Sequence, residues 1–168
     1  MFKKILIPTD GSPLANQAAL EGITLAKQIG AEVVCIYIAR ENQNPAFDFS
    51  DLPVKNNLSA DEYKELVATA GNALMLPLRE AAEKDNVTFT KLIEISNMPA
   101  SRIVQTAEEN GCDLIFMGSQ GSAGWASRLL GSVAAKVVAL SEMPVTVYKV
   151  KKAQVPPKAK INIGVLPI

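Results

Sequence analysis

The sequence contains no histidine, and this absence limits the chemistry that the chain can perform. Histidine is the usual base for serine and cysteine nucleophiles and a common metal ligand, so triad hydrolysis and histidine metal sites are excluded. The serine-elbow pattern Gly-x-Ser-x-Gly and the P-loop pattern ending in Gly-Lys-Ser/Thr are also missing. A serine hydrolase and an ordinary P-loop NTPase are therefore not supported.

The chain also lacks a net charge and a long apolar run. Its 17 basic and 17 acidic residues cancel, so there is no basic field that would hold nucleic acid. No apolar run approaches the ~18 residues that a membrane-spanning helix needs, and the first residues lead into a strand pattern rather than a signal peptide. We therefore expect a cytoplasmic protein that binds neither nucleic acid nor a membrane.

Aromatic residues and cysteines are scarce. Because aromatics make up 5% of the residues, the core must consist mainly of Ile, Val, Leu and Ala, which suits an α/β domain. Cys35 and Cys112 lie in or beside apolar strand patterns, where a free thiol behaves as a small buried hydrophobe. A chain of 168 residues is expected to form one domain around such a core.

Strand-like and helix-like patterns alternate along the chain, as they do in parallel βαβ units. Ser12 and Gly30 predict the start and end of the first helix, Ser59-Ala-Asp-Glu62 is a capping box for the second, and Pro77 is expected to kink that helix or end its first half. The expected fold is a doubly wound, five-stranded parallel sheet in the order 3-2-1-4-5, with helices on both faces. The predicted strands cover residues 2–8, 32–39, 87–95, 113–117 and 145–150.

The most informative loop runs from Gly118 to Ser132, between a strand pattern and a helical pattern. Glycines let backbone N–H groups approach an anion, and a helix N-terminus adds unpaired donors and a positive dipole end. The loop therefore predicts a phosphate cradle; the alternative is a tight connection in which Ser132 caps the helix. We expect Trp125 to anchor the loop rather than shield a ligand, and Arg128 to be solvated rather than to contact a phosphate.

A second loop arrives at the same place in the predicted topology. Pro8-Thr9-Asp10 follows the first strand, and the glycine loop follows the neighbouring fourth strand, at the switch point where doubly wound folds bind ligands. For Asp10, contact with a ligand and capping of its own turn are equally compatible with the sequence. Residues 40–58 predict a long loop or lid, for which a functional role and a neutral insertion both stay open.

These motifs resemble those of the universal stress protein family. The family's nucleotide motif, Gly-x2-Gly-x9-Gly-Ser/Thr, corresponds here to Gly118, Gly121, Gly131 and Ser132. The resemblance implies a Rossmann-like fold of the adenine nucleotide alpha hydrolase-like type over residues 1–150, with residues 151–168 as a C-terminal extension. It extends to the segments Ile5-Leu-Ile-Pro-Thr-Asp-Gly-Ser12, Asp113-Leu-Ile-Phe-Met-Gly-Ser119, Gly131-Ser-Val133 and Pro144-Val145.

The resemblance also implies a site for ATP, ADP or AMP, with Mg²⁺ or Mn²⁺ held through the phosphates. Gln120 departs from the histidine or arginine often expected at its position, which removes a cation that would favour a triphosphate. The residues implied near the adenosine end are Pro8, Thr9, Asp10 and Ile38. Those implied around the ribose and phosphates are Met117, Gly118, Gln120, Gly121, Gly131, Ser132 and Val133.

The expected function is that of a cytosolic, ATP-binding stress-response sensor or regulator, not an enzyme. The alternatives are a dimeric scaffold of the same family without useful nucleotide binding, and a weak ATP hydrolase. The resemblance points to a homodimer through antiparallel pairing of the edge strand Val145-Thr-Val-Tyr-Lys-Val150. We expect the apolar end Ile161-Asn-Ile-Gly-Val-Leu-Pro-Ile168 to dock on the same chain or on the dimer mate.

Overall fold

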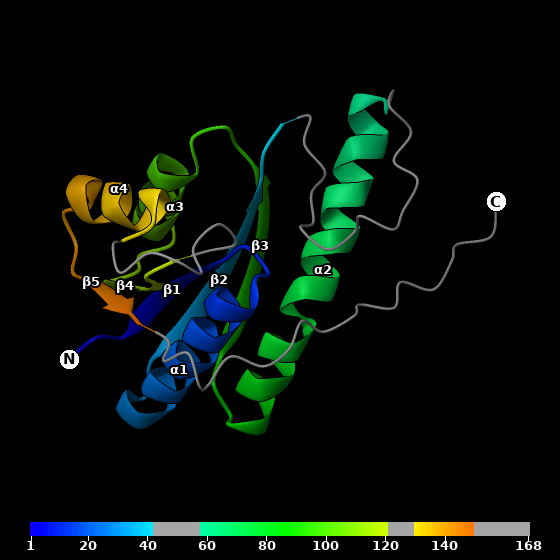
Figure 1. Cartoon of the computed structure of the whole chain (residues 1–168). Helices are drawn as coiled ribbons and strands as arrows, with labels where there is room; N and C mark the ends of the chain where they lie inside the picture. The colour runs from blue at the N-terminus through cyan, green and yellow to red at the C-terminus, as the bar shows by residue number, and fades with distance from the viewer. Residues whose placement is uncertain (42–57, 121–129, 150–168) are drawn as a thin grey trace.

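The computed structural model describes residues 1–41, 58–120 and 130–149 (Figure 1). Within these residues the strands form one sheet, in which every neighbouring pair is parallel. The strand order is β3-β2-β1-β4-β5, so the predicted doubly wound topology is confirmed. The strands are β1 (Lys4–Thr9), β2 (Glu32–Ala39), β3 (Phe89–Ile95), β4 (Leu114–Gly118) and β5 (Val145–Tyr148).

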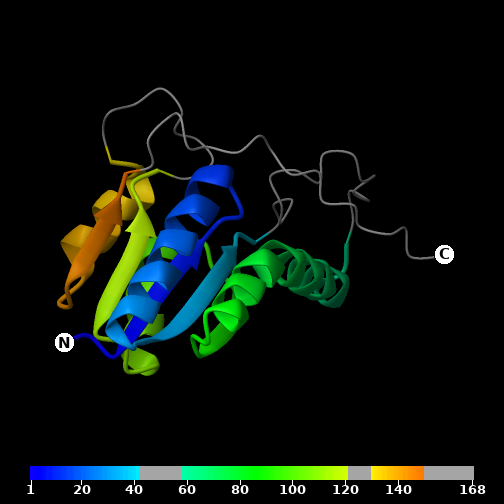
Figure 2. The same cartoon turned by 90° about the horizontal axis from the view of Figure 1, so that it is seen from below.

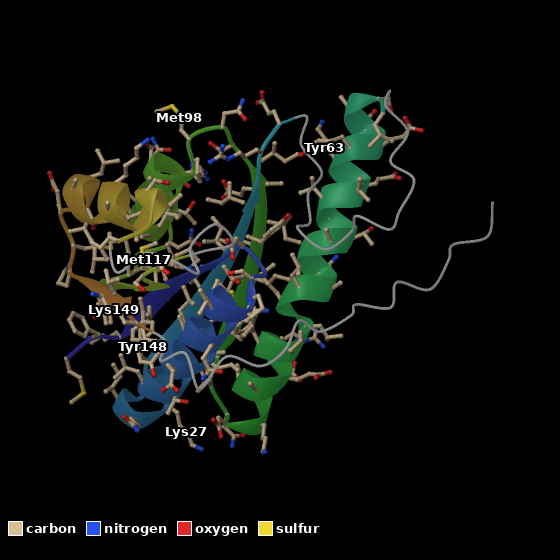
Figure 3. The ribbon with its side chains drawn as sticks, in the orientation of Figure 1. Lys27, Tyr63, Met98, Met117, Tyr148 and Lys149 are labelled. Atoms are coloured by element: carbon tan, nitrogen blue, oxygen red, sulfur yellow. The ribbon has the colours of Figure 1, made fainter. Side chains whose placement is uncertain are left out.

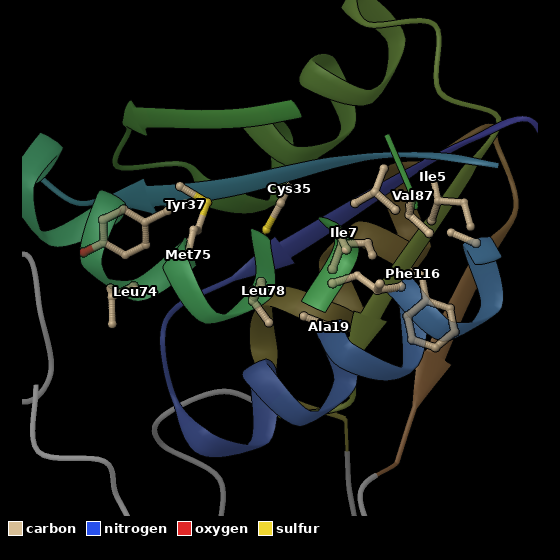
Figure 4. Packing of buried hydrophobic residues seen from close by; sticks show 14 of the residues in the cluster. Ile5, Ile7, Ala19, Cys35, Tyr37, Leu74, Met75, Leu78, Val87 and Phe116 are labelled. Atoms are coloured by element: carbon tan, nitrogen blue, oxygen red, sulfur yellow. The ribbon is translucent and has the colours of Figure 1, made fainter. Parts of the chain in front are cut away.

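Helices cover both faces of the sheet (Figures 1 and 2), and Figure 4 shows the apolar layer under α1 and α2. Ile5 and Ile7 of β1 enter this layer, whereas Leu6 enters the layer under α3 and α4. Among the described helices, none combines the length and the apolarity that a membrane span requires. The helices are α1 (Pro13–Ile29) and α2 (Ala60–Lys84) on one face, and α3 (Pro99–Glu109) and α4 (Ser132–Leu140) on the other.

α1 lies close to the sheet because its inner face consists of small residues. A Cβ atom at Gly22 would lie 2.7 Å from Cδ1 of Ile7, so only glycine fits there without a shift. Ser12 caps the helix by accepting a hydrogen bond from the Ala15 N–H at 3.2 Å. Gly30 ends it with a left-handed φ of 69°. The predicted start and end of this helix are therefore confirmed.

α2 begins with the predicted capping box, in which Ser59 and Glu62 each bond the other's backbone N–H. The helix then runs through Pro77, so the prediction that Pro77 ends its first half is wrong. Figure 2 shows the axis of α2 changing direction in its middle, as a proline kink does. Pro77 is exposed, so water can satisfy the carbonyl that loses its N–H partner, while the buried Leu74 and Leu78 hold the helix against the sheet.

Three strands begin later than predicted, β1 and β3 by two residues and β4 by one, and in β1 and β3 other partners bind backbone groups near the strand start. The N–H of Lys4 donates to the Asp113 carboxylate at 3.0 Å, and β1 begins only at this residue. The N–H of Val87 donates to the carbonyl of Ala82 in α2, so β3 begins at Phe89. Both bonds tie strand starts to neighbouring elements at the amino edge of the sheet.

Both cysteines are buried free thiols, as predicted. Burial raises the pKa of the Cys35 thiol to about 12 and that of Cys112 to about 11. At neutral pH neither side chain is a thiolate, so both act as small apolar core residues.

Candidate functional site

The end of β1 separates from β4 at the carboxyl edge of the sheet. β1 pairs with β2 as far as Thr9, but its pairing with β4 stops at Leu6. The Asp113 N–H donates to the Lys4 carbonyl, so the even-numbered residues of β1 face β4, and Pro8 has no N–H to offer on that side. The two strands therefore part at the topological switch point, where doubly wound folds bind ligands.

The turn after β1 is closed by its own side chains. Asp10 Oδ1 accepts a hydrogen bond from the Ser12 N–H at 3.0 Å, so the turn-capping role that the sequence left open is present. A carboxylate offers about four acceptor positions, so this bond does not exclude a ligand at Asp10. Gly11 adopts a φ of 77°, a left-handed conformation that favours glycine.

Thr9 uses its side chain inside the same turn. Its hydroxyl donates to Asn16 Oδ1 at 2.9 Å and accepts from the Gly11 N–H at 3.1 Å, and the residue is 5% exposed. The Thr9 hydroxyl is therefore used within the turn, and the Thr9 backbone is paired with β2. Asn16 was not among the predicted residues, although a polar amide in the first turn of a helix, just after the Pro8-Thr9-Asp10 loop, was a usable signal.

The two halves of the glycine motif are joined by a backbone hydrogen bond. The Ser119 N–H donates to the Tyr148 carbonyl at 2.9 Å, and the Gly131 N–H donates to the Ser119 carbonyl at 2.8 Å. The end of β4 and the start of α4 therefore lie side by side, as the predicted cradle requires.

α4 begins with a glycine cap rather than a serine cap. Gly131 is the N-cap residue, with φ −62° and ψ 154°, and Ser132 is the first helical residue. The suggestion that Ser132 is the helix cap is therefore wrong, whereas a tight connection without a ligand stays an open alternative. The first intrahelical bond is donated by Ala135 to Gly131, so the N–H groups of Ser132 and Val133 have no intrahelical acceptor. Such groups are suitable donors to an anion.

Gly118 is in close contact with α1. A Cβ atom there would lie 3.4 Å from Ala18 Cβ and 3.8 Å from Ala15 Cα. A larger side chain at this position would meet α1, so this glycine has a packing role in addition to any role in ligand binding.

Three predicted site residues pack on the α3 and α4 face. Met117 is buried in that layer, and Figure 3 shows it between the sheet and α4. Ile38 and Val133 are half-buried and pack against the same cluster. Met117 can therefore contribute its backbone to a site, whereas Ile38 and Val133 retain some exposed apolar surface.

The structure brings most of the predicted residues to one edge of the sheet. Gly121 lies outside the described residues, as do Trp125, Arg128 and the segments 42–57 and 150–168. The described residues come from the ends of three strands and the start of one helix: Pro8, Thr9 and Asp10; Ile38; Met117, Gly118 and Gln120; and Gly131, Ser132 and Val133. Their contacts with a nucleotide stay a prediction.

One cluster of charged groups joins α3 to the end of β3. The Arg102 guanidinium of α3 bonds the carboxylates of Glu94 and Glu109, and these hydrogen bonds raise its pKa. Burial raises the pKa of the Tyr37 hydroxyl, and the nearby Tyr63 and Asp10 raise it further. In the parts of the chain that the structure describes, no group of three His, Cys, Asp or Glu side chains could hold a metal ion.

Comparison with known proteins gives the family of the chain. Residues 1–149 match the model of the universal stress protein family. Universal stress protein MJ0531 of Methanocaldococcus jannaschii is 37% identical over 155 residues, which cover 92% of this chain and 86% of that protein.

Solved structures share the fold. The structure of MJ0577 from the same organism superposes with a TM-score of 0.73 at 28% identity, covering 90% of this chain and 98% of that one. A universal stress protein solved in complex with cAMP superposes with a TM-score of 0.61 at 22% identity, covering 88% and 97% of the two chains. With the family model matched from the first strand to the last, this chain belongs to the universal stress protein family.

Proposed function

We propose that this chain binds an adenine nucleotide, namely ATP, ADP or AMP, at the carboxyl edge between β1 and β4. The observation that carries the proposal is the end of β1–β4 pairing at Leu6, with the Asp10 turn on one side and the Ser119–Gly131 contact on the other. The family member solved with cAMP supports an adenine nucleotide as the class of ligand.

The chemistry of the two sides suggests how the nucleotide is oriented. The Asp10 carboxylate suits the hydroxyl and amine donors of adenosine, and the half-buried Ile38 offers apolar contact to a base. The N–H groups that lack an intrahelical acceptor and the dipole of α4 suit the phosphates, together with the Ser132 hydroxyl. The neutral Gln120 amide can donate to a phosphate but adds no positive charge.

A divalent cation, Mg²⁺ or Mn²⁺, would bind through the phosphates rather than through a protein site. This follows from the described residues, which hold no group of three suitable side chains. Phosphate oxygens are the usual principal ligands of Mg²⁺ in nucleotide sites.

The proposed role is that of a cytosolic stress-response sensor or regulator, whose shape or partner affinity depends on the bound nucleotide. We propose a binding protein rather than an enzyme, because the chain has no histidine base and no P-loop lysine. A dimeric scaffold without useful nucleotide binding is the second candidate, favoured by the uncharged Gln120. Weak ATP hydrolysis is a third and would appear as phosphate release.

Titration calorimetry with ATP, AMP and GTP tests the proposal, together with mass spectrometry of gently purified protein. We expect ATP and AMP to bind, GTP to bind more weakly, and an adenine nucleotide to be retained on purification. A wild-type protein that shows no heat with any of them and retains no nucleotide would favour the scaffold.

Gly131→Val tests the phosphate side of the site. Gly131 has a φ of −62°, which valine adopts without strain, so the variant should fold. The added side chain should keep the phosphates from the helix N-terminus and weaken ATP binding about a hundredfold, or ~2.8 kcal/mol. Ala135→Val, at an exposed position in the same helix, is the matched control and should bind like the wild type. Equal affinity of both variants for ATP would show that the start of α4 is not part of the site.

We also propose a homodimer through β5. Among the described residues this strand lies at one edge of the sheet, and no described strand pairs with its outer side. The neighbouring α4 exposes the side chains of Val138 (46%) and Leu140 (52%), and Lys136 is its sole charged residue. A helix that is apolar on most sides is expected to be covered. A second copy pairing along β5 would lie beside this surface.

A further inference from the structure

We propose that Asn16 is a positioning residue, which fixes the backbone of the Thr9–Ser12 turn in the conformation that receives the nucleotide. The inference rests on the proposed function, because it concerns the β1 side of that site. It assigns a role to a side chain that neither the family resemblance nor the predicted site residues include.

The hydrogen bonds of Asn16 close a ring with the turn. The Gly11 N–H donates to Thr9 Oγ1 at 3.1 Å, the Thr9 hydroxyl donates to Asn16 Oδ1 at 2.9 Å, and Asn16 Nδ2 donates to the Gly11 carbonyl at 3.4 Å. Each of these groups is hydrogen-bonded to the next, so the ring fixes the orientation of the Asn16 amide. Asparagine supplies both an acceptor and a donor here, which alanine or aspartate does not.

The turn is supported on its other side by α2. A Cβ atom at Gly11 would lie 2.5 Å from Cδ2 of Leu74, and Leu74 is 7% exposed. The left-handed Gly11 is therefore held between Leu74 of α2 and Asn16 of α1. Rotation of the Gly11 carbonyl or N–H would break the ring.

Helix propensity gives no reason for asparagine at this position. Alanine is the better helix former, and the residues around Asn16 on α1 include Ala15, Ala18 and Ala19. The polar amide therefore serves the turn and not the helix. Its effect on the site is to preset the backbone of Thr9 and the direction of Asp10, whose Oδ1 is bonded to Ser12 in the same turn. A preset turn loses less conformational freedom when a ligand binds.

The test compares Asn16→Leu with Gln17→Leu. Leucine is close in size to asparagine and cannot make either bond of the ring. Gln17 is the next residue of α1, and its amide lies 3.4 Å from Glu21 on the same helix, outside the turn. We expect Asn16→Leu to weaken binding of ATP and of AMP by about the same factor, roughly tenfold, because both share the adenosine end. Gln17→Leu should bind both like the wild type.

A double-mutant cycle separates positioning from a general loss of stability. Thr9→Val breaks the same ring from the other side, so the double variant should bind ATP about as well as the weaker single variant. If the fold losses of ATP affinity in the two single variants multiply in the double variant, the proposal is overturned. Asn16→Asp keeps the acceptor for Thr9 but not the donor to Gly11, and it should bind ATP more weakly than the wild type. This variant tests the proposal on its own if Asn16→Leu does not fold.

The possible failures are distinguishable. If the wild type binds neither ATP nor AMP, the proposed function fails. If the wild type binds both and Asn16→Leu matches Gln17→Leu, the site stands and the positioning role of Asn16 is overturned. A loss for ATP much larger than for AMP would also overturn it, since the effect would then lie at the phosphates.

Discussion

The carboxylate of Asp113 accepts a hydrogen bond from the backbone N–H of Lys4 at 3.0 Å, which ties the first residue of β1 to the residue before β4. A second bond comes from the Lys3 N–H at 2.8 Å. Partial burial raises the pKa of Asp113, but these backbone bonds lower it by more, so the pKa lies below its ordinary value.

This pKa predicts a pH-dependent contribution to stability. A depressed folded-state pKa stabilises the protein above the unfolded-state pKa of about 3.9, and the contribution is lost as the pH falls through the folded-state value. We expect Asp113→Asn to lower the free energy of unfolding at pH 7 by about 1 kcal/mol, a small value because the carboxylate is partly exposed. Urea unfolding of both proteins at pH 7 and pH 3 checks this. A difference that does not shrink at pH 3 would contradict it.

Gly118 is predicted to tolerate alanine but not valine. An added Cβ would make ordinary contact with Ala18 at 3.4 Å, whereas the two further methyl groups of valine would press against α1. Gly118→Val should lower the free energy of unfolding by about 1–3 kcal/mol, and Gly118→Ala by less than about 1 kcal/mol. Denaturant unfolding measures both. Equal stability of the two variants would show that α1 is not in contact with this position.

Val147→Pro is predicted to weaken the proposed dimer without disrupting the sheet. The carbonyls of Pro144 and Tyr148 accept hydrogen bonds from β4, so the even-numbered residues of β5 face β4 and Val147 directs its backbone outward. Proline would remove an N–H from the open edge and leave the bonds to β4 in place.

Light scattering across the micromolar range measures this effect. We expect the dimer dissociation constant to rise about tenfold or more, with unchanged secondary structure by circular dichroism. Thr146→Pro, whose N–H faces β4, should instead destabilise the monomer. A wild-type protein that is monomeric throughout this range would rule out the dimer.

Deletion of residues 155–168 is predicted to lower the melting temperature or the dimer affinity while ATP still binds. These residues lie outside the described part of the structure, and the prediction rests on the apolar residues at the end of the sequence. Calorimetry and light scattering of the truncated protein measure the two quantities. Unchanged values of both would show that this extension is a free end.

The sequence by itself determined the order and type of the elements, and it predicted the sheet edge at which the candidate site lies. Local signals were sufficient because caps, left-handed glycines and apolar runs act within a few residues, as at Ser12, Gly30 and the Ser59 capping box. The alternation of strands and helices then left the order 3-2-1-4-5 as the expected topology, and the sheet has it.

Only the tertiary structure decided how far each local tendency applies. Pro77 does not end α2, because burial of residues on both sides outweighs the loss of one backbone hydrogen bond. The Thr9 hydroxyl donates to Asn16, and Gly118 packs against α1. Both contacts depend on where α1 lies on the sheet, which no local sequence pattern specifies. The sequence indicates which residues reach the carboxyl edge, whereas packing decides which of their atoms face a ligand.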